Sequence, residues 1–266
     1  FGVCKELKEV TLPKSLQTIG YQTFEYCDSL TAVTLPDSLE TLDQEAFYSC
    51  KNLKTVKFGN NLKEIGVCAF ENCDSLNNIV LPNSLKTIRN RAFFGCSSLT
   101  SVKLGDNITE IGERALCRAR FKELILPRNL KELGESAFDT SSCTKIVVYK
   151  NLQKVGKYAL ASFGSCAVHG ESINGVYYPG TVDKVDFYYE GTKAQWEKIS
   201  KDTEIFGDYD CSYSRPRVPH YHSDHCIRFH YGTTKYQSQS YKITFNKNAK
   251  NATLKTTSKQ VKTNSK

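Results

Sequence analysis

The chain has 266 residues, of which 39% are apolar, and it carries a formal net charge of +8. It contains no run of about 18 apolar residues, the length that a membrane-spanning helix requires, so a helical membrane span is excluded for this sequence. The basic excess is local, because residues 211–266 hold 11 Lys or Arg and one acid, Asp224. The positive net charge is therefore a property of the C-terminal part, and it indicates no function for residues 1–210.

A 23-residue unit repeats along the first 160 residues and is marked by regularly spaced cysteines. These are Cys4, Cys27, Cys50, Cys73 and Cys96. Apolar positions keep the same period, as in Leu7, Leu30, Leu53, Leu76 and Leu99. Such a period is typical of a solenoid, in which each turn buries its apolar side chains against its neighbours. Phe1 matches the last aromatic residue of a unit, so we expect the solenoid to start upstream.

Each unit divides into a strand and a return segment. Val10-Thr11-Leu12 alternates apolar and polar residues as a strand does, and Pro13 ends it. Stacked turns would pair these strands in a parallel sheet, about 4.8 Å apart. We expect left-handed backbone at the return-segment turn. Asp43 tolerates this backbone, but Arg89 at the same position does not fit the expectation, and the pattern does not explain it. The other residues at this position are Gly20, Gly66, Gly112, Gly134 and Gly156.

The full pattern, LxxVxLPxxLxxIGxxAFxxC over residues 1–160, resembles the BspA-like family of leucine-rich repeat proteins. The resemblance implies an α/β-type repeat, a right-handed solenoid with a parallel concave sheet, irregular or short-strand return segments and a mainly β C-terminal cap. Members of that family are displayed or secreted by anaerobic bacteria and mucosal protozoa, where they look like adhesins. The resemblance therefore implies an extracellular location, either at the cell surface or secreted.

We place a C-terminal cap at residues 161–206, where the period is lost. Residues 185–189 have the pattern of a strand that leads into a helix, and Thr192 with Gln195 forms a capping box. This element is similar to the VYYxGTxxxWxxI sequence at the end of BspA-like arrays. We expect Trp196 to close the open end of the solenoid, since terminal turns need capping; stacking on a substrate is the alternative.

Residues 207–266 are interpreted as a basic β-type linker or the start of a further domain. The segment from Tyr241 to Asn248 is similar to the opening strand of a Listeria–Bacteroides repeat, which commonly follows such solenoids. The Lys-rich tail lacks Arg and has few aromatic residues, so we expect no nucleic-acid partner. Electrostatic binding to anionic wall polymers is an alternative.

This segment also contains the one candidate metal constellation of the sequence. Imidazole and thiolate groups are suitable ligands for zinc or copper, and the candidates are His220, His222, Asp224, His225, Cys226 and His230. No CxxC pair accompanies them, and no HxxxH pair lies on an evident helix. We therefore expect an exposed polar strand or loop, without a metal or any other cofactor.

The eleven cysteines allow two interpretations. Equivalent cysteines of neighbouring turns are close enough for a disulfide, which an extracellular location favours. A cysteine that recurs beside the core Phe in every turn is better explained as a small buried hydrophobic residue. We expect a ladder of free thiols at the five positions in register, while the flanks of Cys211 and Cys226 suit a disulfide.

Binding by surface is the function that the repeats support. No GxSxG, HExxH, Walker or GxGxxG motif occurs, so we expect no enzyme. The fifth position of LxxVxL points away from the core, and this row changes from polar to apolar along the array. Exposed contiguous apolar surface often marks interaction. We predict a binding surface on the concave face, formed by Lys57, Val80, Lys103, Ile125, Val147 and Tyr149.

The leading hypothesis is an adhesion module that binds a host extracellular-matrix protein, a glycan or another cell surface. In a second interpretation, the apolar residues of this row are present because they have high β-propensity, and the next domain covers them. An alternative of another class is a structural spacer that projects other domains from the cell wall. We expect a monomer in each case.

Overall fold

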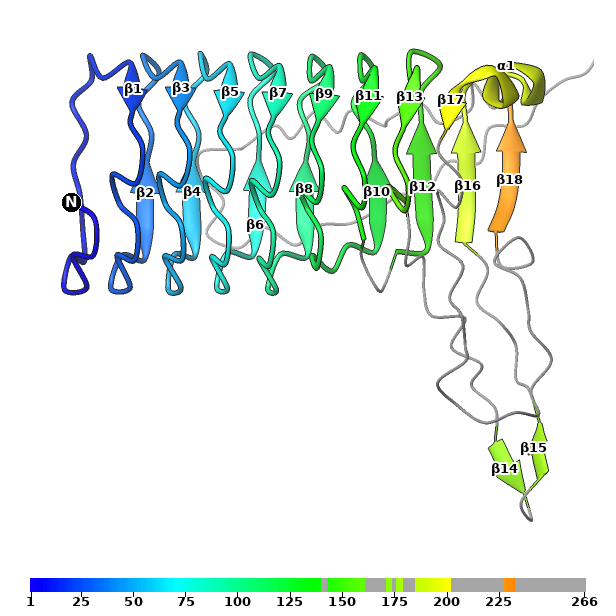
Figure 1. The fold of residues 1–266 in the computed structure, drawn as a ribbon, viewed down its shortest axis with the longest axis horizontal. Helices are drawn as coiled ribbons and strands as arrows, with labels where there is room; N and C mark the ends of the chain where they lie inside the picture. Colours follow the sequence, from blue (N-terminus) through cyan, green and yellow to red (C-terminus); the bar gives the residue numbers. More distant parts are fainter. Residues whose placement is uncertain (140–142, 161–170, 174–175, 179–184, 202–226, 233–266) are drawn as a thin grey trace, which may run out of the picture. The chain divides into compact units, whose positions relative to one another are not determined.

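The computed structural model describes residues 1–139, 143–160, 171–173, 176–178, 185–201 and 227–232. Short β-strands make up almost all of the regular structure in these segments, and their one helix, α1, spans Lys193–Lys198. Figure 1 shows the turns following one another from β1 to β13 as a stacked coil. The solenoid that the 23-residue period predicts is therefore confirmed.

The LxxVxL part of each turn forms the longer strands. They are β2 (Ala32–Thr34), β4 (Thr55–Lys57), β6 (Asn78–Val80), β8 (Ser101–Lys103), β10 (Glu123–Ile125), β12 (Lys145–Val148), β16 (Val185–Tyr189) and β18 (Ile227–Tyr231). All their pairings are parallel, β2 with β4, β6 with β8, and β10-β12-β16-β18 in order. In the first three, the central apolar residue is buried between two exposed neighbours, as alternation along a strand predicts.

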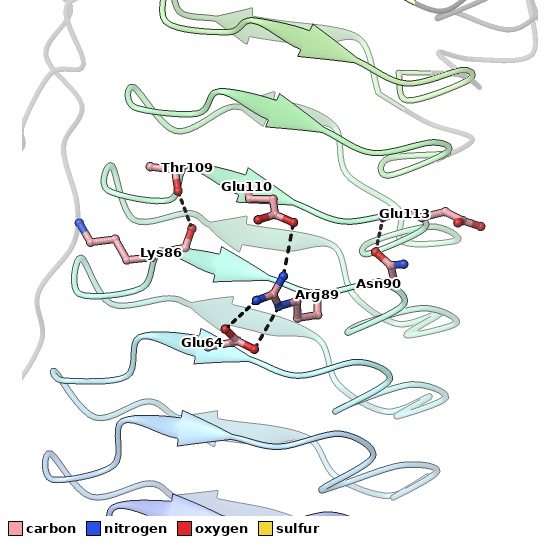
Figure 2. A network of polar contacts seen from close by, with 7 residues as sticks. All are labelled: Glu64, Lys86, Arg89, Asn90, Thr109, Glu110 and Glu113. Atoms are coloured by element: carbon pink, nitrogen blue, oxygen red, sulfur yellow. Dashed lines mark hydrogen bonds and ion pairs between the residues drawn. The ribbon is translucent and has the colours of Figure 1, made fainter.

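The return segments supply a second, shorter strand per turn. These are β1 (Thr18–Ile19), β3 (Thr41–Leu42), β5 (Glu64–Ile65), β7 (Thr87–Ile88), β9 (Glu110–Ile111), β11 (Glu132–Leu133), β13 (Lys154–Val155) and β17 (Ser200–Lys201). They pair in this order as one parallel sheet of eight strands. Figure 2 shows strands of this sheet in front and strands of the LxxVxL row behind them. The eight-stranded sheet and the longer strands thus lie on opposite sides of the coil.

A stack of aromatic rings fills the core of the early turns. The buried rings are those of Phe24, Phe47, Phe70 and Phe93. Neighbouring centroids are 5.0, 5.3 and 5.2 Å apart, and the ring planes are within 16° of parallel. This offset-stacked spacing is favourable for aromatic pairs, so the repeated Phe ties each turn to the next.

The cysteine ladder lies directly beside this stack. Cys50 Sγ is 3.0 Å from the carbonyl oxygen of Phe24, one turn back, and the same contact measures 3.2 Å in each of the next two turns. All described cysteines are free thiols; four of the five in register are buried, and Cys4, in the first turn, is exposed. The buried-thiol interpretation is confirmed for these four. A thiol suits the position because it is small and also donates to a buried carbonyl.

The expectation of left-handed backbone at the turn glycines is wrong. Positive φ occurs two residues later in each turn, at Gln22, Glu45, Cys68, Arg91, Arg114, Ser136 and Tyr158. Gly66 is instead explained by close packing, because a Cβ there would lie 2.6 Å from the carbonyl carbon of Asp43 in the preceding turn. Arg89 therefore violates no backbone requirement.

Both sets of strands continue beyond residue 160. β16 pairs with β12, and β17 pairs with β13, so residues 185–201 form another turn with α1 between its two strands. β18 then pairs with β16 and adds one further strand. Separately, β14 (Glu171–Ile173) and β15 (Val176–Tyr178) form an antiparallel pair. The boundaries predicted at residues 160 and 206 stay predictions.

The helix of this turn has the N-terminal cap that the sequence predicts. The Thr192 hydroxyl accepts from the Gln195 backbone, and the Gln195 side chain accepts from the Thr192 backbone, which confirms the capping box. Trp196 is buried, with its ring centroids 5.0 Å from that of Phe187 and 5.3 Å from that of Tyr189. Trp196 thus fills the core of the turn that β16 and β17 add.

Candidate functional site

The fifth position of LxxVxL forms a row of side chains across the longer strands. We call it the strand-face row, and it comprises Thr34, Lys57, Val80, Lys103, Ile125, Val147, Tyr188 and His230. Strand pairing sets its paired members side by side, as for Val80 with Lys103 and Ile125 with Val147. The repeat therefore places residues that lie far apart in sequence in one row, although β4 is not paired with β6 and β8 is not paired with β10.

Two apolar members of the row are exposed. Val80 has 63% of its surface exposed and Ile125 has 42%. Lys57 and Lys103 are exposed in the strands to either side of β6, and neither belongs to an ion pair found among the described residues. The centre of the row thus offers apolar surface together with two ammonium groups.

Two of the six predicted binding residues are not available on this surface. Val147 is 4% exposed and Tyr149 is 8% exposed, so the exposure expected for them is wrong. Val147 lies in register between Ile125 and Tyr188, whose larger side chains flank it. The ring of Tyr149 lies under the guanidinium of Arg128, 4.5 Å from ring centroid to Cζ. The candidate surface therefore keeps Lys57, Val80, Lys103 and Ile125.

Two members of the row were missed by sequence reasoning. Tyr188 and His230 occupy this position in β16 and β18, and their rings stack with centroids 4.4 Å apart. His230 Nε2 also lies 3.0 Å from Asp186 Oδ1. The missed signal is the alternation at residues 185–189, which puts Phe187 in the buried position and Tyr188, which is half-buried, in the outward one. The row therefore extends two strands past Val147.

The opposite side of the coil carries a charged network that joins three turns. Arg89 donates from Nε and Nη2 to the two carboxylate oxygens of Glu64, at 3.0 and 3.1 Å, and its Nη1 lies 3.6 Å from Glu110. Figure 2 shows the guanidinium between these two carboxylates. The single guanidinium pairs with carboxylates of the turns on either side of it, so we assign the network to stability and not to ligand binding.

A second ion pair is more deeply placed. Arg91 binds both carboxylate oxygens of Glu71, at 2.5 and 2.8 Å, and the Glu71 side chain is buried. Burial raises the pKa of the Glu71 carboxyl, but hydrogen bonds from Arg91 and Cys68 outweigh it and leave the pKa below its usual value. This carboxylate is held ionised as a structural partner and is not a general acid.

A family model identifies the repeats. The model for the BspA type leucine-rich repeat region matches residues 1–79 and 65–186, with six copies. The chain belongs to the BspA-type leucine-rich repeat family. The solenoid of this family is typically a non-enzymatic scaffold for protein interactions.

Several solved structures of bacterial leucine-rich repeat proteins are similar to this chain. A protein from Bacteroides ovatus is 23% identical, with a TM-score of 0.48, over 60% of this chain and 52% of that chain. TpLRR of T. pallidum is 26% identical, with a TM-score of 0.42, over 56% and 59%. A leucine-rich cell surface protein of Faecalibacterium prausnitzii is 19% identical, with a TM-score of 0.46, over 75% and 64%. This BspA-type chain therefore spans roughly half to two thirds of their lengths. No curated protein matches it.

Metal ligands and nucleophiles are the remaining chemical groups of this BspA-type chain where the structure describes it. Within these segments no cluster of three or more His, Cys, Asp or Glu is suited to a metal ion. The predicted candidates His220, His222, Asp224, His225 and Cys226 lie outside the described residues, as does Cys211. Burial raises the pKa of the Cys50 thiol to about 12, so it is a poor nucleophile at neutral pH. No helix in the described part is long and apolar enough to cross a membrane.

Proposed function

We propose that this chain is an extracellular, non-enzymatic adhesion module that binds a protein partner through the strand-face row. The observation that carries the proposal is the exposure of Val80 and Ile125 on strands whose central residues are buried in the core. Apolar side chains in an exposed row gain free energy when a partner covers them. Membership of a family of interaction scaffolds supports the same conclusion.

The chemistry of the row favours a protein as partner. Val80 and Ile125 offer branched apolar groups that fit a protein surface, while Lys57 and Lys103 add positive charge beside them. Charges across an interface steer association and exclude wrong partners more than they add affinity. We therefore propose a partner with an apolar patch next to acidic side chains, such as an extracellular-matrix protein or a protein of another cell surface.

The alternative is a spacer that holds other domains away from the cell wall and binds nothing. A binding screen of the whole chain against immobilised extracellular-matrix proteins and mucins separates the two. Retention of a matrix protein supports the module, whereas no retention at micromolar concentration supports the spacer. The variant Val80→Thr/Ile125→Thr keeps β-branched side chains while removing apolar surface, and we expect it to lose retention. Tyr21→Ser, which removes an exposed side chain outside the row, is the control.

A further inference from the structure

A groove with polar lining crosses four turns at the start of the short return strands. It has a volume of about 350 Å³ and lies where the chain enters β7, β9, β11 and β13. One row of its lining consists of Asn107, Asn129 and Asn151, and the other of Lys86, Thr109, Lys131 and Gln153. Figure 2 shows Lys86 and Thr109 where the chain enters β7 and β9. The groove is therefore separate from the strand-face row.

The groove is positively charged and has no lining acid. One turn earlier, the equivalent Lys63 Nζ lies 2.6 Å from Glu40 Oε2. By contrast, none of the ion pairs found in the described part of the chain includes Lys86 or Lys131. Two ammonium groups without a paired carboxylate make the groove attractive to an anionic ligand.

The asparagine side chains are held in fixed orientations. Asn107 Nδ2 donates to Asn83 O at 3.0 Å, Asn129 Nδ2 donates to Asn107 Oδ1 at 3.2 Å, and Asn151 Nδ2 donates to Arg128 O at 2.9 Å. An amide NH₂ has two donors, and the carbonyl oxygen has two acceptor sites. Each side chain thus keeps hydrogen-bonding capacity while its orientation is already set, which lowers the entropic cost of binding.

The shape and repetition of the groove indicate the class of ligand. Its lining repeats once per turn, about 4.8 Å apart as for paired strands, which suits an extended polymer that presents polar groups at regular intervals. The lining contains no aromatic ring on which a neutral sugar would stack and no apolar side chain for a hydrophobic peptide. We propose that the groove binds an acidic polysaccharide, with its carboxylate or sulfate groups on Lys86 and Lys131 and its hydroxyl groups on the asparagine row.

This site goes beyond the proposed protein-binding function, and its test is independent of that function. Heparin, which is sulfated, and polygalacturonate, which is carboxylated, are titrated into the whole chain by calorimetry at about 0.15 M salt. Lys86→Gln/Lys131→Gln is compared with Lys51→Gln/Lys54→Gln, which removes the same charge from exposed residues outside the groove and the strand-face row. Because both variants keep the basic C-terminal segment, non-specific attraction contributes equally to each.

We expect the groove variant to bind at least one of the two polymers about tenfold more weakly or worse, as loss of two charge-assisted hydrogen bonds implies. The control should change by less than about twofold, since its lysines lie outside the groove and exposed charges at a distance are largely screened at this salt. Dependence on one polymer alone would identify sulfate or carboxylate as the recognised group. No binding of either polymer, or equal losses in the two variants, would overturn the proposal. If polyglutamate bound as tightly as the polysaccharides and through the same lysines, the ligand of the groove would be an acidic protein and not a polysaccharide.

Discussion

Removing one ring from the Phe stack tests how the turns hold together. Phe70 is fully buried, and its ring lies 5.3 Å from that of Phe47, 5.2 Å from that of Phe93 and 5.8 Å from that of Phe58. Phe70→Ala removes these contacts and leaves a cavity between two turns. Such a change typically costs about 3–5 kcal/mol of unfolding free energy. Urea unfolding followed by circular dichroism measures the loss.

Two control variants are expected to lose less unfolding free energy than Phe70→Ala. Phe70→Leu keeps most of the volume, and Leu116, the equivalent residue two turns later, is itself buried, so we expect a loss of about 1.5 kcal/mol or less. Phe1→Ala removes a ring that stacks on Phe24 but is 73% exposed, and we expect about 0.5 kcal/mol or less. If Phe70→Ala cost no more than Phe1→Ala, the stack would not be the element that joins the turns.

Three further predictions concern the glycines, thiols and buried carboxylate. Gly66→Ala should cost about 1–3 kcal/mol in urea unfolding through overpacking, whereas Gly20→Ala, whose Cβ would meet nothing closer than 3.8 Å, should cost under about 0.5 kcal/mol. The pKa of Cys50, raised to about 12 by burial, exceeds the value of about 8.5 for a free thiol. The unfolded chain therefore loses protons first, and the unfolding free energy should fall as pH rises from about 9 towards 12, less steeply in Cys50→Ala. Glu71→Gln should cost about 1.5–3 kcal/mol at neutral pH by weakening the pair with Arg91; because the pKa of Glu71 is lowered, this difference should shrink as pH falls below about 4.5.

The sequence predicted the architecture because every turn of a solenoid meets the same environment. Val33, Val56 and Ile79 occupy one position of the repeat, and all three are buried. A residue type retained at one position over many turns therefore reports its burial directly. The same argument held for the cysteines, whose position beside the Phe stack explains their free thiols.

The features that depend on contacts between particular turns were not predictable from the pattern. Gly66 is required by its distance to the turn before it, and not by its own backbone conformation. Val147 is buried because Tyr188 lies beside it, and the strand that carries Tyr188 is separated from β12 by an interruption of the period. The polar groove is a similar case, since Asn107, Asn129 and Asn151 come together only when the turns are stacked.

The central claim is that the strand-face row binds a protein, and one affinity comparison tests it most directly. A matrix protein retained in the binding screen is titrated with the unmodified chain, with Val80→Thr/Ile125→Thr and with Lys86→Gln/Lys131→Gln. We predict that the first variant weakens binding by about tenfold or more and that the second leaves it unchanged. Unchanged affinity in Val80→Thr/Ile125→Thr would contradict the claim.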